Sequence, residues 1–200
     1  MSHLPPGRPA VARVLSRRRL LDDFFKVDEL QLTVESDDGS TSAPQRRLVF
    51  ERGDSVAALV RERATGDLFF TEQLRAPTLA HGSGWLLELM AGMIEPGESP
   101  EASLRRELVE ELGFEPARLE AVSRFYVSPG GSSERIWLYA VEVDESSRIG
   151  DGGGVAHESE DIRVVRLPEA EARARLASGE IADAKTIIAL QWHFARMQRG

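Results

Sequence analysis

Three glutamates at helical spacing could hold a metal ion. Glu107, Glu110 and Glu111 lie three and four residues apart, so a helix would bring their carboxylates to one face. Like charges so placed repel one another, and a divalent cation would turn that repulsion into binding. Ligand sets made only of oxygen atoms suit Mg²⁺ or Mn²⁺. A solvated acidic surface is the alternative, because Glu is a good helix former.

The flanking residues predict the helix that these glutamates require. Ser99 is a good N-cap, Pro100 fits the first helical position, and Gly113 is a natural stop. An apolar stripe recurs every four residues between them, at Leu104, Leu108 and Leu112. We therefore expect a helix over residues 100–112, with Arg106 and Glu110 paired along it. A tight loop over residues 92–97 precedes it, because glycine and proline punctuate that stretch.

The complete pattern around the glutamates is more specific than the helix alone. It reads Gly92, five residues, Glu98, seven residues, Arg106-Glu107, Leu108, one residue, Glu110-Glu111, one residue, Gly113 and Phe114. This pattern resembles the signature of the Nudix hydrolases at every fixed position. The resemblance implies cleavage of a nucleoside diphosphate linked to another group, with two or more Mg²⁺ ions for which Mn²⁺ can substitute. It further implies that Glu107, Glu110, Glu111 and the backbone carbonyl of Ala91 hold the metal.

The resemblance covers roughly residues 20–194 and is to the ADP-ribose pyrophosphatase branch. The supporting segments are residues 46–53, 71–77, 85–98, 128–135 and 157–164, and Pro129 lies sixteen positions after Gly113. This branch implies hydrolysis of ADP-ribose to AMP and ribose 5-phosphate. A related branch that cleaves GDP-mannose and similar nucleotide sugars shares the 128–135 loop, so such a substrate is the alternative. A non-catalytic nucleotide-sugar sensor would generally lack signature acids, all of which are present here.

Further site residues follow from the resemblance. A general base must deprotonate the attacking water. Glu134, on a glycine- and serine-rich loop, is the first candidate, and Glu160 is the second. Glu134 could instead be a turn carboxylate paired with Arg135. The expected catalytic residues are thus Glu134, Glu110 and Glu160.

The resemblance also implies substrate contacts from two regions. Arg75 would meet the diphosphate or the nucleoside, although it could also be an exposed charge at a strand end. The N-terminal hairpin would contribute Arg46 or Arg47, and Phe24 or Phe25 would stack on the base. The full set assigned to substrate binding is Arg75, Arg46, Arg47, Phe25, Glu88 and Ser133.

Composition narrows the class of protein. The chain has 200 residues, a net charge of −8 and no cysteine. The charge disfavours nonspecific binding to nucleic acid or an anionic membrane, and the lack of cysteine excludes thiolate ligands and disulfides. No run of apolar residues is long enough to span a membrane, and the N-terminus lacks the apolar region of a secretory signal. A cytoplasmic location is the default expectation.

An N-terminal extension is expected ahead of the main domain. Residues 11–19 carry four arginines and are predicted to form a solvated arm. Strand-like alternation over 27–34 and 46–51 predicts an antiparallel hairpin. Two strands alone are marginal in water, so the hairpin should pack on a second copy of the chain and form a homodimer. We divide the chain into an arm and hairpin at residues 1–54 and a hydrolase domain at residues 55–200.

The main domain alternates short strands with few helices. Strands are predicted at residues 55–60, 68–73, 85–90, 119–125, 135–143 and 162–166, and further helices at 169–177 and 183–197. This pattern indicates an α+β fold. The resemblance implies a Nudix-like α/β/α sandwich with a central mixed sheet, carrying the N-terminal antiparallel extension. The glycine-rich residues 146–157 open no helix and lack a P-loop lysine, so they predict a mobile connection or lid rather than a phosphate cradle.

Overall fold

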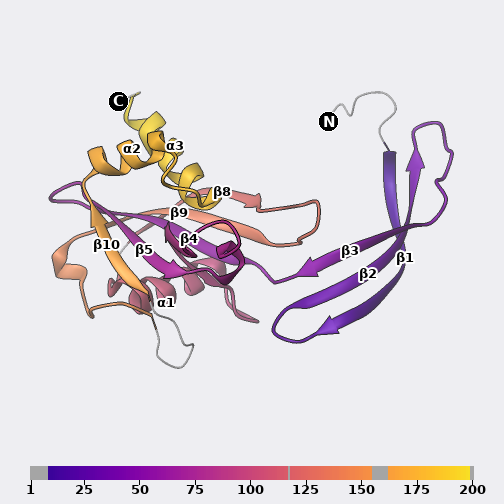
Figure 1. The fold of residues 1–200 in the computed structure, drawn as a ribbon, viewed down its shortest axis with the longest axis horizontal. Helices are drawn as coiled ribbons and strands as arrows, with labels where there is room; N and C mark the ends of the chain where they lie inside the picture. Colours follow the sequence, from indigo (N-terminus) through magenta and orange to yellow (C-terminus); the bar gives the residue numbers. More distant parts are fainter. Residues whose placement is uncertain (1–8, 117, 155–161, 199–200) are drawn as a thin grey trace. The chain divides into compact units, whose positions relative to one another are not determined.

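The computed structural model describes residues 9–116, 118–154 and 162–198. The chain forms two compact units (Figure 1). The smaller unit comprises the residues as far as Gly53 together with Ser128–Glu134, and the larger unit comprises Asp54–Val127 and the chain from Arg135 onward. The segment Ser128–Glu134 thus belongs with the N-terminal residues, which a division at residue 54 does not anticipate.

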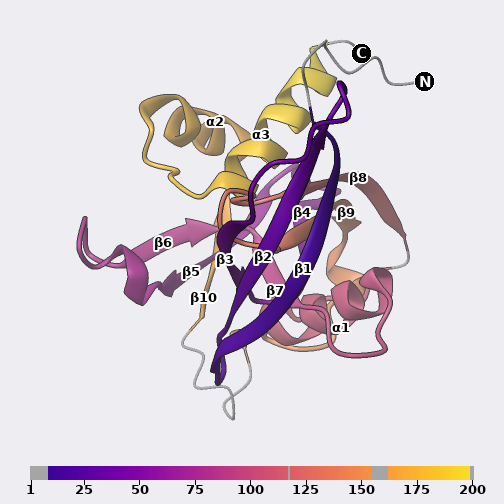
Figure 2. The same ribbon diagram turned by 90° about the vertical axis from the view of Figure 1, so that its right-hand side faces the viewer.

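The smaller unit is built on a three-stranded antiparallel sheet of order β1-β2-β3 (Figure 2). Its strands are β1 (Pro9–Asp22), β2 (Lys26–Ser36) and β3 (Gln45–Glu51). The predicted hairpin corresponds to β2 and β3. Gly39 lies in the turn after β2 with a φ of 82°, a conformation that glycine adopts without strain.

Residues 11–19 are exposed, as the prediction of a solvated arm requires, but they lie within β1, a strand that the sequence did not predict. Alternation along a strand brings Arg17 and Arg19 to the same face. Both donate hydrogen bonds to Asp28 of β2, with 2.6 Å from the Nε of Arg17 to the carboxylate. Asp28 is buried in the sheet. The arginines therefore serve to satisfy a buried acid across the strand pair.

The loop Ser128–Glu134 is attached to β3. The Phe50 N–H donates to the carbonyl of Gly131 at 2.7 Å, and the Ser133 N–H donates to the carbonyl of Phe50 at 3.2 Å. The Ser133 hydroxyl also bonds the carboxylate of Glu51. A segment some eighty residues further along the chain is thereby fixed to the N-terminal sheet.

The larger unit holds a seven-stranded mixed sheet. Its strands are β4 (Ser55–Glu62), β5 (Leu68–Leu74), β6 (Trp85–Glu88), β7 (Met90–Met93), β8 (Leu119–Tyr126), β9 (Arg135–Val143) and β10 (Arg163–Leu167). The main path runs β10-β5-β4-β9-β8, and only β4 and β9 pair in parallel among these described strands. The single strand predicted at 85–90 is two strands. It changes partner at Leu89, since β6 pairs with β5 and β7 pairs with β4.

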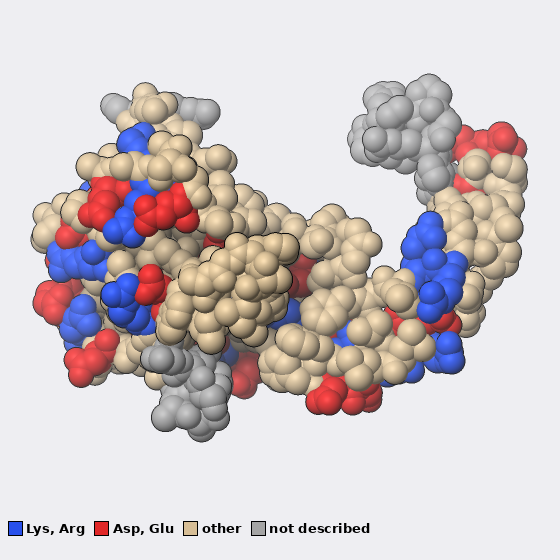
Figure 3. Space-filling model, in the orientation of Figure 1, with Lys and Arg blue, Asp and Glu red and all other residues tan. Residues whose placement is uncertain are grey.

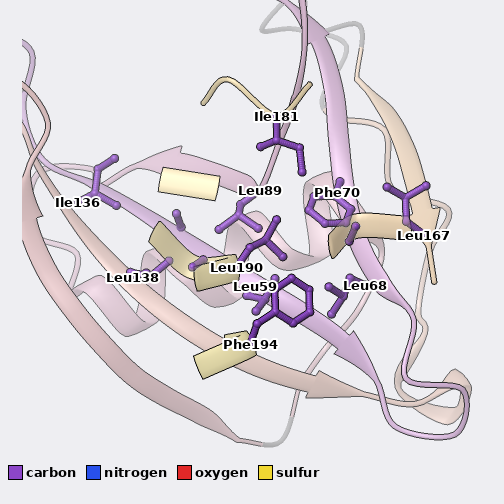
Figure 4. Close-up of a cluster of buried hydrophobic side chains, with 13 residues drawn as sticks. Leu59, Leu68, Phe70, Leu89, Ile136, Leu138, Leu167, Ile181, Leu190 and Phe194 are labelled. Carbon is purple, nitrogen blue, oxygen red and sulfur yellow. The ribbon is translucent and has the colours of Figure 1, made fainter. Parts of the chain in front are cut away.

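Helices cover both faces of this sheet (Figure 1). They are α1 (Pro100–Leu112), α2 (Glu169–Ser178) and α3 (Ala184–Met197). Val56, Ala58 and Val60 of β4 pack in the cluster that contains the leucines of α1. Ala57 and Leu59 pack in the cluster that contains residues of α2 and α3 (Figure 4). This alternation confirms the predicted α+β fold, with a central mixed sheet between helices.

Charged side chains of both signs are interspersed over the face of the larger unit seen in Figure 3. Many of them pair between elements, for example Arg61 of β4 with Glu169 of α2 at 3.0 Å. Among the described residues, no helix is long and apolar enough to cross a membrane.

Candidate active site

Helix α1 has the limits that its sequence predicts. The Ser99 hydroxyl accepts from the Ala102 N–H at 3.2 Å and caps the first turn. Gly113 ends the helix in the left-handed region, with a φ of 75°. The leucine stripe, formed by Leu104, Leu108 and Leu112, is fully buried against the sheet. Burial of this stripe fixes the rotation of the helix and therefore the direction of its acidic face.

Two of the signature glutamates lie against the backbone of β7. The Ala91 N–H donates to Oε2 of Glu111 at 3.3 Å, and Glu111 is only 1% exposed. The Glu107 carboxyl lies so close to Gly92 that a Cβ at that position would be 1.8 Å from the Glu107 Cδ. Gly92 is therefore needed because it leaves room for an acid. The structure thus brings together Ala91, Glu107 and Glu111.

Arg106 pairs with three of the signature acids, namely Glu98, Glu107 and Glu110. Its Nη1 donates to Glu107 Oε1 at 2.8 Å and to Glu110 Oε2 at 2.9 Å, which confirms the predicted pairing with Glu110. Its Nη2 lies 3.3 Å from Oε2 of Glu98. Burial lowers the Arg106 pKa, but the Glu98 hydrogen bond and the neighbouring carboxylates outweigh it, so the pKa is raised overall. Because one nitrogen bonds both Glu107 and Glu110, these carboxylates converge on a common point.

The donor set fits a hard divalent cation. Carboxylate and carbonyl oxygens are the ligands that Mg²⁺ prefers, and the acids lie around the Ala91–Gly92 backbone. Within the described parts of the chain, however, no three acidic or imidazole side chains already stand as a ready ligand group.

A glycine-rich segment closes the end of α1. The Gly153 N–H donates to the carbonyl of Glu111 at 2.8 Å, and the Gly154 N–H donates to that of Glu110 at 3.0 Å. Gly152 has a φ of 73°, and a Cβ there would lie 2.4 Å from the Glu111 carbonyl oxygen. This part of the predicted mobile connection is therefore tied to the helix that carries the acids. Residues 155–161, with the candidate base Glu160, lie outside the described residues.

Arg75 follows β5 and forms a bidentate pair with Glu88 of β6. Its Nε and Nη2 each lie 2.9 Å from one carboxylate oxygen of Glu88. Burial raises the pKa of Glu88, but the Arg75 hydrogen bond and the charge of Lys185 outweigh it, so this pKa falls. Lys185, from α3, lies 2.6 Å from Glu88. Lys185 was not among the predicted site residues, because a single lysine in an amphipathic helix gives no signal of burial.

The first candidate for the base lies in the smaller unit. Glu134 is 8% exposed and lies 3.4 Å from Arg52. Arg135 pairs instead with Asp54 at 2.6 Å. The alternative interpretation of Glu134 as the partner of Arg135 is therefore wrong.

The remaining predicted substrate contacts also belong to the smaller unit. Arg46 bonds Glu29 of β2, and Arg47 bonds Gln45. Phe25 lies at the turn between β1 and β2, with its ring 5.1 Å from that of Phe50. It is 43% exposed. The smaller unit thus carries Phe25, Arg46, Arg47, Ser133 and Glu134, whereas the larger unit carries Arg75, Glu88 and the signature acids.

Comparison with known families agrees with the geometry of α1. The family model of the NUDIX domain matches residues 51–188 of the sequence. The chain belongs to the Nudix family. Enzymes of this family generally use divalent metal ions such as Mg²⁺, in keeping with the oxygen ligands gathered at α1.

Several curated relatives of this Nudix hydrolase span most of its length. A GDP-mannose pyrophosphatase of Pectobacterium atrosepticum is 39% identical over 180 residues, covering 89% of this chain and 91% of the relative. A protein of the same name from Yersinia pestis is 39% identical, covering 86% of each chain. A third, from Yersinia enterocolitica, is 40% identical and covers 86% of this chain and 90% of the relative.

Proposed function

We propose that this Nudix hydrolase cleaves the diphosphate of a nucleotide sugar, with GDP-mannose as the first candidate substrate. The observation that carries this choice is the name shared by relatives that are aligned over most of both chains. It favours the alternative that the sequence left open over ADP-ribose, which none of these relatives' names supports. Addition of one water across the diphosphate of GDP-mannose would yield GMP and mannose 1-phosphate.

The carboxylates of α1 would hold Mg²⁺, with Mn²⁺ as a substitute. The proposed ligands are Glu107, Glu110, Glu111 and the carbonyl of Ala91, and two or more ions would account for so many acids. Bound metal would neutralise the diphosphate and lower the pKa of the attacking water. The support is the convergence of Glu107 and Glu110 on one nitrogen of Arg106, and the contact of Glu111 with Ala91.

Glu134 remains our proposal for the general base. Its loop is bound to β3, and its carboxylate is buried beside Arg52 rather than fully solvated. A base held in one orientation has an advantage over a mobile one, since proton transfer needs hydrogen-bond contact with the water. Glu160 is the second candidate. Comparing the two substitutions to Gln decides between them.

The predicted substrate contacts stay proposals residue by residue. Arg75 would contact the diphosphate, and Arg46, Arg47 and Ser133 would contact the nucleotide. Phe25 offers a partly exposed aromatic ring for stacking on the base. Glu88, which the sequence also assigned to substrate binding, has a carboxylate that already accepts from Arg75 and Lys185, so we propose that it acts through Arg75.

We also propose that the chain forms a homodimer through its smaller unit. Strand β1 is at the edge of its sheet and exposes large apolar side chains, namely Val11, Val14, Leu15, Leu20 and Leu21. Exposed apolar edge strands tend to pair with another chain. Light scattering should give twice the chain mass, and Val14→Lys should shift the protein to monomer while the control Ser16→Lys does not. A monomeric wild-type protein would refute the proposal.

A substrate panel tests the proposed function. GDP-mannose, ADP-ribose, ADP-glucose and a nucleoside triphosphate are incubated separately with the protein and Mg²⁺, and the products are identified. We expect the highest kcat/KM with GDP-mannose. A clear preference for ADP-ribose would restore the interpretation favoured by the sequence. Binding without turnover of any compound would instead indicate a non-catalytic sensor.

A further inference from the structure

Lys185 is a buried lysine that the signature does not explain. It lies in the first turn of α3 and is 8% exposed. Lysine is almost never buried unless it is paired. Its Nζ lies 2.6 Å from Glu88 Oε2 and 3.1 Å from Asp183 Oδ1. The lysine therefore joins two acids from different elements, the strand β6 and the cap of α3.

Glu88 connects Lys185 to Arg75, because its carboxylate accepts hydrogen bonds from both side chains. The carboxylate is 2% exposed and accepts from the Nε and Nη2 of Arg75 and from the Nζ of Lys185. A bidentate pair fixes the plane of the guanidinium. Within the described part of the chain, Arg75 uses its Nε and Nη2 for side-chain hydrogen bonds and leaves its Nη1 without one. Since the Arg75 side chain is 34% exposed, this end of the guanidinium can reach an anion.

The first turn of α3 is itself fixed to the strand that reaches the acids. The Leu89 N–H donates to the Thr186 hydroxyl at 2.8 Å, and the Leu89 side chain packs in the same core as Leu190 (Figure 4). Leu89 separates β6 from β7. Two residues later, the Ala91 N–H contacts Glu111. One short stretch of chain thus carries both the holder of Arg75 and the backbone beside the signature acids.

We propose that Lys185 is a positioning residue that holds Glu88 so that Arg75 presents its Nη1 to the diphosphate of the substrate. The inference rests on the proposed hydrolysis of a nucleotide sugar. It gives Glu88 an indirect role, because a buried carboxylate that already accepts three hydrogen bonds is poorly placed to meet an anionic substrate. Without the lysine, the Glu88 side chain would be held on one side only, and Arg75 would lose its fixed orientation.

Substitution of Lys185 by Met tests the proposal, because Met keeps the length and removes the charge. We expect Lys185→Met to raise the KM for GDP-mannose by roughly tenfold, a coupling typical of neighbouring charged residues, with kcat and the Mg²⁺ requirement changed much less. Lys185→Arg should restore most of the affinity. In an Arg75→Lys background, Lys185→Met should add little further loss, since both act on the same contact.

Thr186→Val is the matched control. It removes the acceptor of the Leu89 N–H and the hydroxyl that donates to Asp183, but it keeps the side chains of Lys185, Glu88 and Arg75. A purely structural role for this turn would make both variants less stable and leave KM unchanged in both. A KM effect confined to Lys185→Met supports positioning. An unchanged KM in Lys185→Met, or full additivity with Arg75→Lys, overturns it.

Binding of GDP separates failure of this inference from failure of the proposed function. If the wild-type protein hydrolyses no nucleotide sugar, the proposed function fails on its own. Calorimetric titration with GDP still reports whether Arg75 meets a diphosphate. Weaker GDP binding by both Arg75→Lys and Lys185→Met, but not by Thr186→Val, supports the inference. Equal binding by wild type and Lys185→Met refutes it.

Discussion

Replacing Gly92 with Ala should lower activity strongly while leaving the fold intact. The added Cβ would lie 1.8 Å from Cδ and 1.9 Å from Oε1 of Glu107. Carbon atoms in contact are about 3.5–4.0 Å apart, so the carboxyl must move by about 1.5–2 Å. The obstacle is the end of a flexible side chain, and no positive φ is recorded for Gly92. The glutamate can therefore swing away without unfolding the strand.

The catalytic cost follows from that displacement. A misplacement of about 1 Å can cost about 100-fold in rate, which equals about 2.7 kcal/mol of transition-state stabilisation. We expect kcat/KM for the preferred substrate of Gly92→Ala to fall by about 10²–10³-fold, with a raised Mg²⁺ requirement. The melting temperature should change by only a few degrees, because replacing Gly with Ala also reduces the entropy of the unfolded chain.

The assay measures initial rates against Mg²⁺ concentration, together with thermal melting. Gly82→Ala is the matched control, because a Cβ there meets nothing within 4 Å and no positive φ is recorded. Combining Gly92→Ala with Glu107→Gln should cost little more than Glu107→Gln alone, since both disable the same ligand. Near-wild-type activity and Mg²⁺ dependence in a folded Gly92→Ala protein would refute the assignment of Glu107 as a ligand positioned by Gly92.

Three further substitutions probe the rest of the site. Glu111→Gln should lose most turnover and most Mn²⁺ binding, which electron paramagnetic resonance measures. Its circular dichroism spectrum should stay unchanged. Full turnover at saturating Mg²⁺ would contradict the assignment of Glu111 as a metal ligand. Gly152→Ala should weaken Mn²⁺ binding more than Gly153→Ala, because a Cβ at Gly152 would meet the Glu111 carbonyl oxygen at 2.4 Å whereas at Gly153 the nearest atom is 3.6 Å away; equal effects would mean that only backbone strain matters. Glu134→Gln should lower kcat more than it raises KM, and if Glu160→Gln does so instead, the base is Glu160.

Local signals made α1 predictable. Its cap, its leucine stripe and its terminal glycine all lie within fifteen residues, and each acts on its neighbours. Strand β1 was missed for the opposite reason. Its arginines resemble a solvated arm until Asp28 is placed beneath Arg17 and Arg19 by the pairing of β1 with β2. When the arginines of one strand pair with an acid on the neighbouring strand, the sequence of the first strand alone does not reveal the pairing.

The contacts that support the site residues could not be predicted from local sequence patterns either. Lys185 lies 97 residues from Glu88, and nothing in the sequence of α3 distinguishes it from a solvated lysine. The break at Leu89 arises because β6 and β7 pair with different strands, although the residues read as one apolar run. Motif residues were predictable because their spacing is fixed by one helix. Residues that position them depend on tertiary packing.

In helix α1, the buried leucines stabilise the fold and the glutamates form the candidate metal site. Each buried leucine of the stripe contributes about 1.5–3 kcal/mol from its transfer out of water, and that gain offsets the repulsion among the acids on the other face. Arg106 reduces this repulsion further by bonding Glu107 and Glu110. Because glutamine has nearly the shape of glutamate and no charge, replacing one acid with its amide keeps the packing, removes repulsion and should not unfold the helix. Loss of activity in such variants can therefore be attributed to the site, whereas Leu108→Ala would lower stability and activity together.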